Sequence, residues 1–453
     1  MRNRHSALVI CPSHRDRREL PPAAQAGVLR LHFHDYASIE LEEMVAPTPR
    51  NVAPACVHDE IERIVLAGAA NNVDAVLSSD DYPGSTLAAI VANRLGLPGT
   101  PVAADLLCQH KYYSRLIQRR ASPDATPQFA LLEPGTVPEL AFPFFIKPVK
   151  SFFSVGAFHI DDLHTLRELT PRATLPEPFF RPLDALLERY VGLKPCGSRV
   201  LAEGFLAGSQ ATFEGYAFEG SVHPVGIVDS VMHPGTIAFE RFDYPSTLPK
   251  SVQSRMAEVA ASVMDALGFT HGLFNIEFRY DAALDRLGIV EINPRMASQF
   301  ADLYEKVDGY STYSVLLDLA LGFRPSLLKR AGRHAAASSC VLRTFEDARV
   351  LSCPSKEEVQ KILDVYPDAR VEVLAEAGDL LSEQLQDGCS FRYAIVNIGG
   401  QNRGDVSQNF NWCRERLTFC FERAAATRSS KAPAVNGTPP KRTLPRDLSF
   451  APP

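Results

Sequence analysis

The chain lacks the cysteine pattern of a disulfide-bonded or zinc-binding protein. Its 453 residues include nine cysteines, an odd number, and no two of them form a Cys-x-x-Cys pair. Scattered cysteines of this kind indicate free thiols in a reducing compartment. We therefore expect a cytoplasmic protein with neither a disulfide framework nor a structural zinc site.

Long apolar runs and a one-sided charge are also missing. No apolar stretch approaches the roughly 20 residues needed to span a bilayer, and residues 1–18 are too charged for a signal peptide. The net charge of −6 gives no indication of nucleic acid or an anionic membrane as a partner. We expect small-molecule substrates and no nucleic-acid or membrane partner. The oligomeric state stays open.

The Gly-x-Gly-x-x-Gly motif of dinucleotide-binding domains is absent, although the first part of the chain has the pattern of an open α/β domain. Strand and helix periodicities alternate along it, at 7–11, 31–36, 57–70, 74–79 and 84–95. Such alternation predicts a mostly parallel sheet. Ser78, Ser79, Asp80 and Asp81 follow the third strand, at the edge where sheets of this kind bind ligands.

The rest of the chain predicts a central antiparallel region and then a further α/β lobe. Helices are expected at 108–119, 251–267, 309–321, 355–365 and 405–423. Strands are expected at 142–148, 157–160, 200–206, 212–217, 222–231, 341–345, 371–374 and 391–398. From about residue 425 the chain turns to Ser, Pro, Lys, Arg and Gly and loses its periodicity, which predicts a disordered tail.

The most informative residues lie on two strand-like stretches, 272–278 and 288–295. The residues between them, 281–287, predict a hairpin. Glu277 lies near the end of the first stretch and Glu291 lies within the second. Pairing of the two stretches would therefore bring these two carboxylates together.

Two more polar side chains join that pair. Glu291, Asn293 and Arg295 alternate along the second strand and so share one face. Carboxylate and amide oxygens suit Mg²⁺ bridging nucleotide phosphates, and an arginine suits a phosphate or a carboxylate. The alternative is an amphipathic hairpin whose charged face is simply solvated. That alternative would have to account for Glu277, Glu291, Asn293 and Arg295 occurring together in this order.

The sequence Asn-x-Glu-Phe followed by Glu-Ile-Asn-Pro-Arg resembles the metal-binding signature of the ATP-grasp superfamily. The resemblance extends from about residue 70 to 325, with the pieces in family order. It implies an α/β (α+β) protein with the ATP-grasp fold. The implied parts are an N-terminal open α/β (pre-ATP-grasp) domain at 1–107, an ATP-grasp domain at 108–325 with lobes at 108–195 and 196–325, a C-terminal α/β lobe at 326–424, and the tail at 425–453.

The resemblance also implies a nucleotide site. Lys111 matches the family's lysine on the helix that enters the central domain, and Lys147 matches the lysine that closes the strand before the flap. Both would contact the phosphates of ATP. Glu203 matches a glutamate that meets the adenine edge or the ribose. The hinge that follows, whose backbone would bind adenine, comprises Gly204, Phe205 and Leu206.

The same resemblance assigns the metal and the catalytic groups. Glu277, Glu291 and Asn293 match the ligands of Mg²⁺ or Mn²⁺. Arg295 matches the arginine that stabilises the transferring phosphate or the substrate, and Lys147 would act with it in catalysis.

The flap after the second lysine departs from the family. Biotin-carboxylase-type members carry a run of glycines there, whereas this chain has only Gly156, with Phe152 and Phe153 in place of glycines. These phenylalanines could form a lid that excludes water. Three other side chains could contribute to the phosphate cradle: Lys150, Ser151 and Ser154. No biotinyl-lysine carrier motif is present either, and both points count against a biotin carboxylase.

The segment 229–246 interrupts an antiparallel run with Pro-Gly and concentrates polar side chains, including His233 and Arg241. It resembles the substrate loop of ATP-grasp ligases that join amino acids. Arg241 would then hold a substrate carboxylate. The alternative is an ordinary surface crossover.

Together these features imply an ATP-dependent carboxylate–amine ligase. A substrate carboxylate would attack the γ-phosphate to give an acyl phosphate and ADP, and an amine, that of an amino acid, would displace phosphate to give an amide. Charge around the β- and γ-phosphates favours release of ADP over AMP. Three alternatives stay open: an enzyme that activates an enol or keto oxygen, as in mycosporine synthesis; a biotin-carboxylase-type enzyme; and a non-catalytic ATP sensor.

Overall fold

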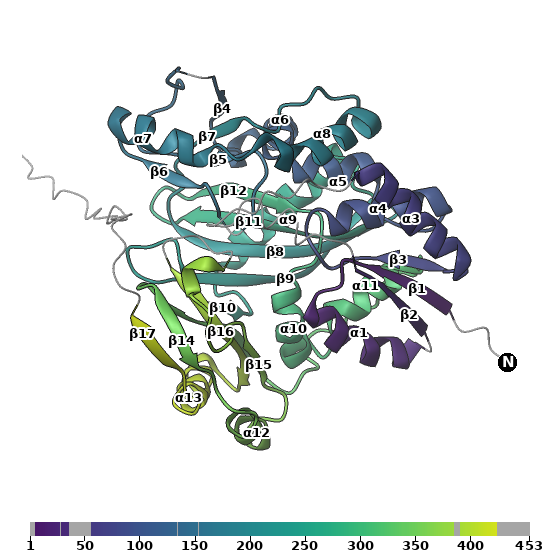
Figure 1. Ribbon diagram of the computed structural model, residues 1–453, viewed down its shortest axis with the longest axis vertical. Helices are drawn as coiled ribbons and strands as arrows, with labels where there is room; N and C mark the ends of the chain where they lie inside the picture. Colours follow the sequence, from purple (N-terminus) through teal and green to yellow (C-terminus); the bar gives the residue numbers. More distant parts are fainter. Residues whose placement is uncertain are drawn as a thin grey trace, which may run out of the picture.

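A computed structural model describes residues 5–27, 29–35, 56–133, 135–152, 154–384 and 390–423. An eight-stranded sheet runs through the middle of the molecule, with a small lobe on one side and the N-terminal domain beside both (Figure 1). Within these residues, every helix is too short or too polar to cross a lipid bilayer. The predicted tail at 425–453 lies outside the described part of the chain.

The N-terminal domain has the predicted parallel sheet, with strand order β2-β1-β3. Its elements are β1 (His5–Ile10), α1 (His14–Gly27), β2 (Leu29–His34), α3 (Val57–Ala70), β3 (Ala75–Leu77), α4 (Gly84–Leu95) and α5 (Val102–Gln109). Helix α1 was not expected from the sequence. It contains Pro21 and Pro22, which usually end or kink a helix and so hide its periodicity.

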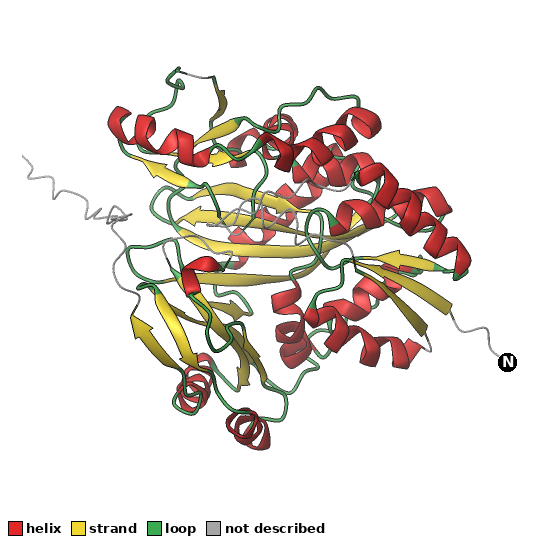
Figure 2. Cartoon of the chain, in the orientation of Figure 1, coloured by secondary structure: helices red, strands yellow, loops and turns green. Residues whose placement is uncertain are grey.

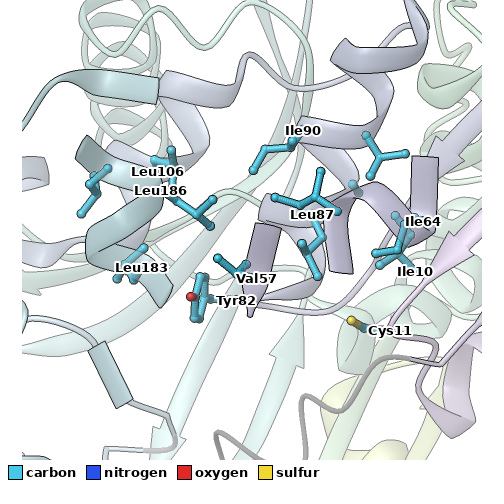
Figure 3. Packing of buried hydrophobic residues seen from close by; sticks show 14 of the residues in the cluster. Ile10, Cys11, Val57, Ile64, Tyr82, Leu87, Ile90, Leu106, Leu183 and Leu186 are labelled. Carbon is cyan, nitrogen blue, oxygen red and sulfur yellow. The ribbon is translucent and has the colours of Figure 1, made fainter. Parts of the chain in front are cut away.

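The small lobe is a four-stranded antiparallel sheet of order β4-β7-β5-β6 with helices against it. Its elements are α6 (Lys111–Ala121), η1 (Pro123–Ala125), β4 (Phe129–Leu132), β5 (Phe144–Pro148), β6 (Phe158–Ile160), α7 (Leu163–Ala173), α8 (Glu177–Val191) and β7 (Val200–Gly204). Leu183 and Leu186 of α8 lie in one hydrophobic cluster with Leu87 of α4 and Leu106 of α5 (Figure 3). The small lobe and the N-terminal domain therefore share a core.

The large sheet has the order β12-β11-β8-β9-β10-β13-β16-β15 and is antiparallel at every pairing. Its first half comprises β8 (Ser209–Phe218), β9 (Ser221–Met232), β10 (Phe239–Tyr244), β11 (Gly272–Asp281) and β12 (Arg286–Asn293). The predicted hairpin is confirmed, because Asp281 pairs with Arg286 beside the turn.

Helices cover the two faces of this sheet. Helix α9 (Lys250–Ala266) packs on one face through apolar residues at helical spacing, such as Val252, Met256 and Ala260. On the other face lie η2 (Ser298–Phe300), α10 (Ala301–Asp308) and α11 (Thr312–Ala320). Figure 2 shows the long strands of this sheet crossing the middle of the molecule.

The C-terminal residues continue the same sheet, with β13, β16 and β15 following β10 in that order. The lobe predicted at 326–424 thus shares its main sheet with the large lobe. Its elements are β13 (Ala336–Thr344), β14 (Ala348–Ser352), α12 (Lys356–Val365), β15 (Arg370–Val373), η3 (Leu381–Glu383), β16 (Phe391–Gly400), α13 (Arg403–Arg414) and β17 (Cys420–Arg423).

Three predicted helices have different bounds. The helix expected at 108–119 is two helices, α5 and α6, because the backbone of His110 between them is extended. The His110 side chain caps α6 by accepting a hydrogen bond from the backbone N–H of Tyr113. The N–H of Lys111 donates to the carbonyl of Val149 instead of to the preceding helix. The one expected at 309–321 begins after Gly309, whose φ of +88° ends α10.

The helix expected at 405–423 ends at Arg414, and the last described residues form β17 instead. β17 pairs with β14, far away in the sequence. Helical periodicity cannot reveal such a partner.

Candidate active site

The small lobe and one face of the large sheet meet in a cluster of ionic side chains. Lys111 is the first residue of α6, and its Nζ lies 2.6 Å from Glu291 Oε1 on β12. Lys147 on β5 lies 2.7 Å from Glu203 Oε2 on the neighbouring β7. The lysines and carboxylates that the sequence singled out therefore come together between the two sheets.

The two carboxylates of the hairpin are direct neighbours, because Glu277 on β11 pairs with Glu291 on β12. Burial, reinforced by the charge of Glu291, raises the pKa of Glu277 to about 7. Gln210 donates to Glu277 at 2.8 Å. Burial would also raise the pKa of Glu291, but Lys111 and Lys147 outweigh it and lower that pKa.

The next cross-strand pair fixes the orientation of the predicted amide ligand. Asn293 donates from Nδ2 to Asn275 Oδ1 at 2.9 Å, and Asn275 donates in turn to the carbonyl of Arg295 at 3.0 Å. These bonds define which end of the Asn293 amide is the oxygen. Asn275 is therefore part of the site's framework, two residues before Glu277 on the same strand face.

A β-bulge ties the small lobe to the hairpin. The register between β11 and β12 shifts after Glu277, which leaves Val290 without a partner residue in the ladder. Its carbonyl accepts from Arg115 Nη2 at 2.7 Å and from Lys147 Nζ at 3.4 Å. The bulge thus supplies an acceptor for two cations of the opposite lobe.

Glu203 is paired at both oxygens. Arg115 donates to them at 2.6 and 3.2 Å, and Lys147 also approaches Oε2. Burial would raise the pKa of Glu203, but these two cations outweigh it and lower the pKa to about 2. The carboxylate therefore holds Arg115 and Lys147 in place. Sequence reasoning missed Arg115, although it lies four residues after Lys111 on one helix face.

The hinge packs closely on the hairpin. The Gly204 N–H donates to the carbonyl of Gln128 at 2.8 Å. Gly208 has a φ of +93°, and a Cβ there would lie 2.0 Å from the Tyr280 carbonyl oxygen, so a glycine is required. This contact holds the connection between the lobes, including Leu206, against the end of β11.

Aromatic side chains gather beside the hinge. Phe205 lies nearly parallel to Phe145, with ring centroids 6.0 Å apart, and His159 meets both rings edge-on. On the large sheet below, Arg279 shares the face of Glu277 and contacts Met232 Sδ at 3.5 Å. Sequence reasoning did not identify this group, since its members come from five different segments.

Arg295 reaches the N-terminal domain. Its Nη2 lies 2.9 Å from Asp81 Oδ2, on the loop after β3 where the sequence predicted a ligand-binding edge. Lys150 also binds Asp81, at 2.9 Å, and donates to Gln109 at 2.6 Å. Lys150 is thus directed into the N-terminal domain and away from Lys147.

The flap forms a tight turn. Phe152 is 8% exposed and packs edge-on against Phe179, so the expectation that it closes over the site as a lid is wrong; Phe153 lies outside the described residues. Ser154 is exposed with a φ of +62°. Its carbonyl accepts from the N–H of Ala157.

The two residues predicted to meet the substrate lie on β10 and just after β9. Strand register places Arg241 on the face opposite Glu277, where it pairs with Glu240 and Asp243. His233 follows β9, with its ring edge-on to Phe345 at 5.2 Å. The structure therefore does not bring Arg241 into the cluster.

A hollow in the described part of the chain lies next to the hinge but outside the ionic cluster. It has a volume of about 970 Å³ and is lined by segments 122–128 and 140–143, hinge residues 204–206, part of α9 and the hairpin turn. None of Lys111, Lys147, Glu277 or Glu291 lines it. We therefore do not assign the nucleotide to it.

The donor set fits a hard divalent cation. No three His, Cys, Asp or Glu side chains converge within the described ranges, so the candidate set is two carboxylates and one amide, Glu277, Glu291 and Asn293. Oxygen donors alone suit Mg²⁺ or Mn²⁺. Burial and the neighbouring charge of Glu291 raise the pKa of Glu277, and a bound cation would stabilise its charged form. The cluster has the composition of a metal- and phosphate-binding centre.

Comparisons with known proteins agree. Residues 140–302 match the family model described as an ATP-grasp domain. The chain is 29% identical over 192 residues to the carbamoyl phosphate synthase large chain of Thermotoga neapolitana, which covers 42% of this chain and 16% of the relative. It is 27% identical over 286 residues to carnosine synthase 1 of Gallus gallus, which covers 58% and 29%. The matched part thus spans less than a third of these relatives.

The solved structure of an L-amino acid ligase from Bacillus licheniformis has the same fold, with a TM-score of 0.68 over 93% of this chain and 100% of the other, at 17% identity. Residues 140–302 therefore form an ATP-grasp domain, and the resemblance inferred from the hairpin signature is confirmed.

Proposed function

We propose that this chain is an ATP-dependent ligase that joins a carboxylate to an amine. The observation that carries the proposal is the Glu277–Glu291 pair facing Lys111 and Lys147 across the two lobes. Paired carboxylates with opposing lysines suit a metal-bound triphosphate. The similarity to carnosine synthase 1 and the shared fold with an L-amino acid ligase favour an amino acid as one substrate. The domain boundaries at residues 107, 195, 325 and 424 belong to this proposal.

In this proposal the nucleotide lies between the lobes. The hinge backbone and the aromatic group of Phe145, His159 and Phe205 hold the base, and Lys111 and Lys147 bind the phosphates. Glu277, Glu291 and Asn293 would hold Mg²⁺ or Mn²⁺, which would neutralise phosphate charge when bound.

The charge balance supports a polyphosphate ligand. Five cationic side chains meet four carboxylates in and around the cluster: Lys111, Arg115, Lys147, Lys150 and Arg295, and Asp81, Glu203, Glu277 and Glu291. The net charge of these nine side chains is therefore positive, and it becomes more positive when Glu277 is protonated.

The chemistry proceeds in two steps. An oxygen of the substrate carboxylate attacks the γ-phosphorus, the bond from that phosphorus to the β-phosphate oxygen breaks, and ADP leaves. The amine nitrogen then attacks the acyl carbon, the carbon–oxygen bond to phosphate breaks, and the amine loses a proton as the amide forms. Arg295 and Lys147 neutralise charge on the transferring group, which is the main catalytic contribution in phosphoryl transfer.

The test is a screen for ADP and phosphate release with pairs of amino acids and carboxylates, followed by mass spectrometry of the products. For an active pair, carboxylate labelled with ¹⁸O should transfer one labelled oxygen to phosphate, and hydroxylamine should trap a hydroxamate. The Glu291→Gln protein, purified in parallel, controls for contaminating ATPases. Release of AMP and pyrophosphate would refute the proposal. ADP release without a hydroxamate would favour phosphorylation of an enol or keto oxygen.

A further inference from the structure

Asp81 joins three parts of the molecule. It lies on the loop between β3 and α4 of the N-terminal domain. Its Oδ2 binds Arg295, which follows the hairpin strand β12, at 2.9 Å. Its Oδ1 binds Lys150, which begins the flap of the small lobe, at 2.9 Å. Each oxygen of one carboxylate therefore faces a cation from a different lobe.

Asp81 itself is held rigidly. Its Oδ1 accepts from the backbone N–H of Tyr82 at 2.7 Å, and its carbonyl accepts from the N–H of Ser85 in the first turn of α4. Tyr82 is 2% exposed and belongs to the core that the N-terminal domain shares with the small lobe (Figure 3). The carboxylate is thus fixed relative to both lobes.

Arg295 is positioned from two sides. Its Nη2 donates a hydrogen bond to Asp81, and its Nη1 donates one to the carbonyl of Met296 at 3.3 Å. A guanidinium has five N–H donors, so these contacts set its plane while other donors can meet a phosphate. Asn275 holds the backbone of Arg295, and Glu214 accepts from the N–H of Ala297 two residues later.

Lys150 links the flap to the N-terminal domain. Its side chain is 4% exposed, and it donates to Gln109 as well as to Asp81. Its ammonium also lies over the rings of Tyr82 and Phe152, at 5.8 and 5.4 Å from their centres. The segment that follows Lys147 is therefore anchored to the same carboxylate as Arg295.

We propose that Asp81 is a positioning residue that sets the guanidinium of Arg295 for the γ-phosphate, and so brings the N-terminal domain into the ATP site. This inference rests on the proposed function for the part that Arg295 has in phosphoryl transfer. Without the carboxylate, Arg295 keeps its place in the chain but loses the contact that fixes its side-chain direction.

The test compares ADP with the non-hydrolysable analogue AMPPNP, both with Mg²⁺, by calorimetry. The ratio of the two dissociation constants measures the affinity gained from the γ-phosphate. Asp81→Asn keeps the shape and removes the charge. It should reduce this ratio about tenfold, the effect of one charge-assisted contact, while the dissociation constant of ADP changes little. Arg295→Gln should reduce it equally, and the double variant no further.

Two further variants separate positioning from folding. Glu62→Gln alters an exposed ion pair with Arg94 in the same domain and should leave the ratio unchanged. Asp81→Glu keeps the charge near both cations but displaces it by one methylene, so it should melt like the wild type with a reduced ratio. If Asp81→Asn does not fold, this second variant decides the question.

Three results would overturn the proposal: an unchanged ratio in Asp81→Asn or, where that variant does not fold, in Asp81→Glu; an equal loss of affinity for ADP and AMPPNP; or a wild-type protein that gains nothing from the γ-phosphate. The proposed ligase activity is tested separately. If the ratio behaves as expected and no carboxylate–amine pair yields ADP, the positioning part stands and the ligase reaction fails.

Discussion

Replacing Glu277 by glutamine should make the free protein more stable while it abolishes metal-dependent nucleotide binding. The substitution keeps the shape of the side chain, and an amide oxygen can still accept from Gln210, which lies 2.8 Å from the carboxylate. What it removes is a negative charge held beside Glu291 in a buried position. Functional residues often cost stability in this way.

The size of the effect follows from the pKa. Glu277 titrates near 4.5 in an unfolded chain and at about 7 in the folded one. A group with a raised pKa in the folded state costs stability as the pH rises from the lower value to the higher one. At about 1.4 kcal/mol per pH unit this amounts to about 3 kcal/mol at pH 8 and less than about 1 kcal/mol at pH 5. Because the titrations of the neighbouring Glu277 and Glu291 are coupled, we expect about 1–3 kcal/mol at pH 8.

Melting temperatures of wild type and Glu277→Gln at pH 5 and pH 8 provide the assay. The variant should melt roughly 2–12 °C higher at pH 8, at about 2–4 °C per kcal/mol, and nearly level with the wild type at pH 5. ADP with Mg²⁺ at about 100 times the dissociation constant should stabilise the wild type by about 2.7 kcal/mol, and the variant far less.

Glu258→Gln, on the exposed side of α9, is the matched control and should show no pH-dependent difference from the wild type. A Glu277→Gln protein that melts below the wild type at pH 8, or a difference that is the same at both pH values, would refute the reasoning. Either result would mean that burial and the charge of Glu291 do not raise the pKa of Glu277 in the free protein.

Three further predictions concern neighbouring residues. Glu291→Gln should keep the fold but lose nearly all turnover, because a negative metal ligand is removed; normal rates at saturating Mg²⁺ would contradict this. Lys147→Ala should weaken ATP binding about ten- to a hundredfold, and unchanged affinity in calorimetry would exclude Lys147 from the site. Glu203→Gln should destabilise the protein by about 3–5 kcal/mol, since it leaves Arg115 and Lys147 without their buried counter-ion. As the folded pKa of Glu203 is lowered to about 2, the wild type should hold this stability above pH 4.5 and lose it only as the pH falls toward 2, which acid denaturation followed by circular dichroism can test.

Local sequence patterns were sufficient to predict the structure where the periodicity of one segment specifies it. The hairpin follows from alternation in two adjacent strands, and the set of residues proposed to bind a metal follows from its face, because side chains two residues apart in a strand must point the same way. Helix α9 and the parallel N-terminal sheet follow from periodicity in the same manner. The order of these motifs was enough to predict the ATP-grasp domain.

Local patterns failed where a residue's partner lies far away in the chain. Nothing near Arg241 in the sequence tells which face of the sheet it occupies, because that depends on its register with β9 and β13. Phe152 was expected in a lid and is buried against α8 instead. Such outcomes depend on how whole elements pack.

By itself the sequence determined the resemblance to ATP-grasp domains and the hairpin face proposed to hold a metal, since both depend on side chains within a few residues of one another. Only the tertiary structure decided how the charges are paired. Asp81 and Arg295 are separated by 214 positions yet lie 2.9 Å apart, and Glu203 is bound to Arg115 from a different element. Buried charges require partners, and which partners they find is decided when the lobes pack together.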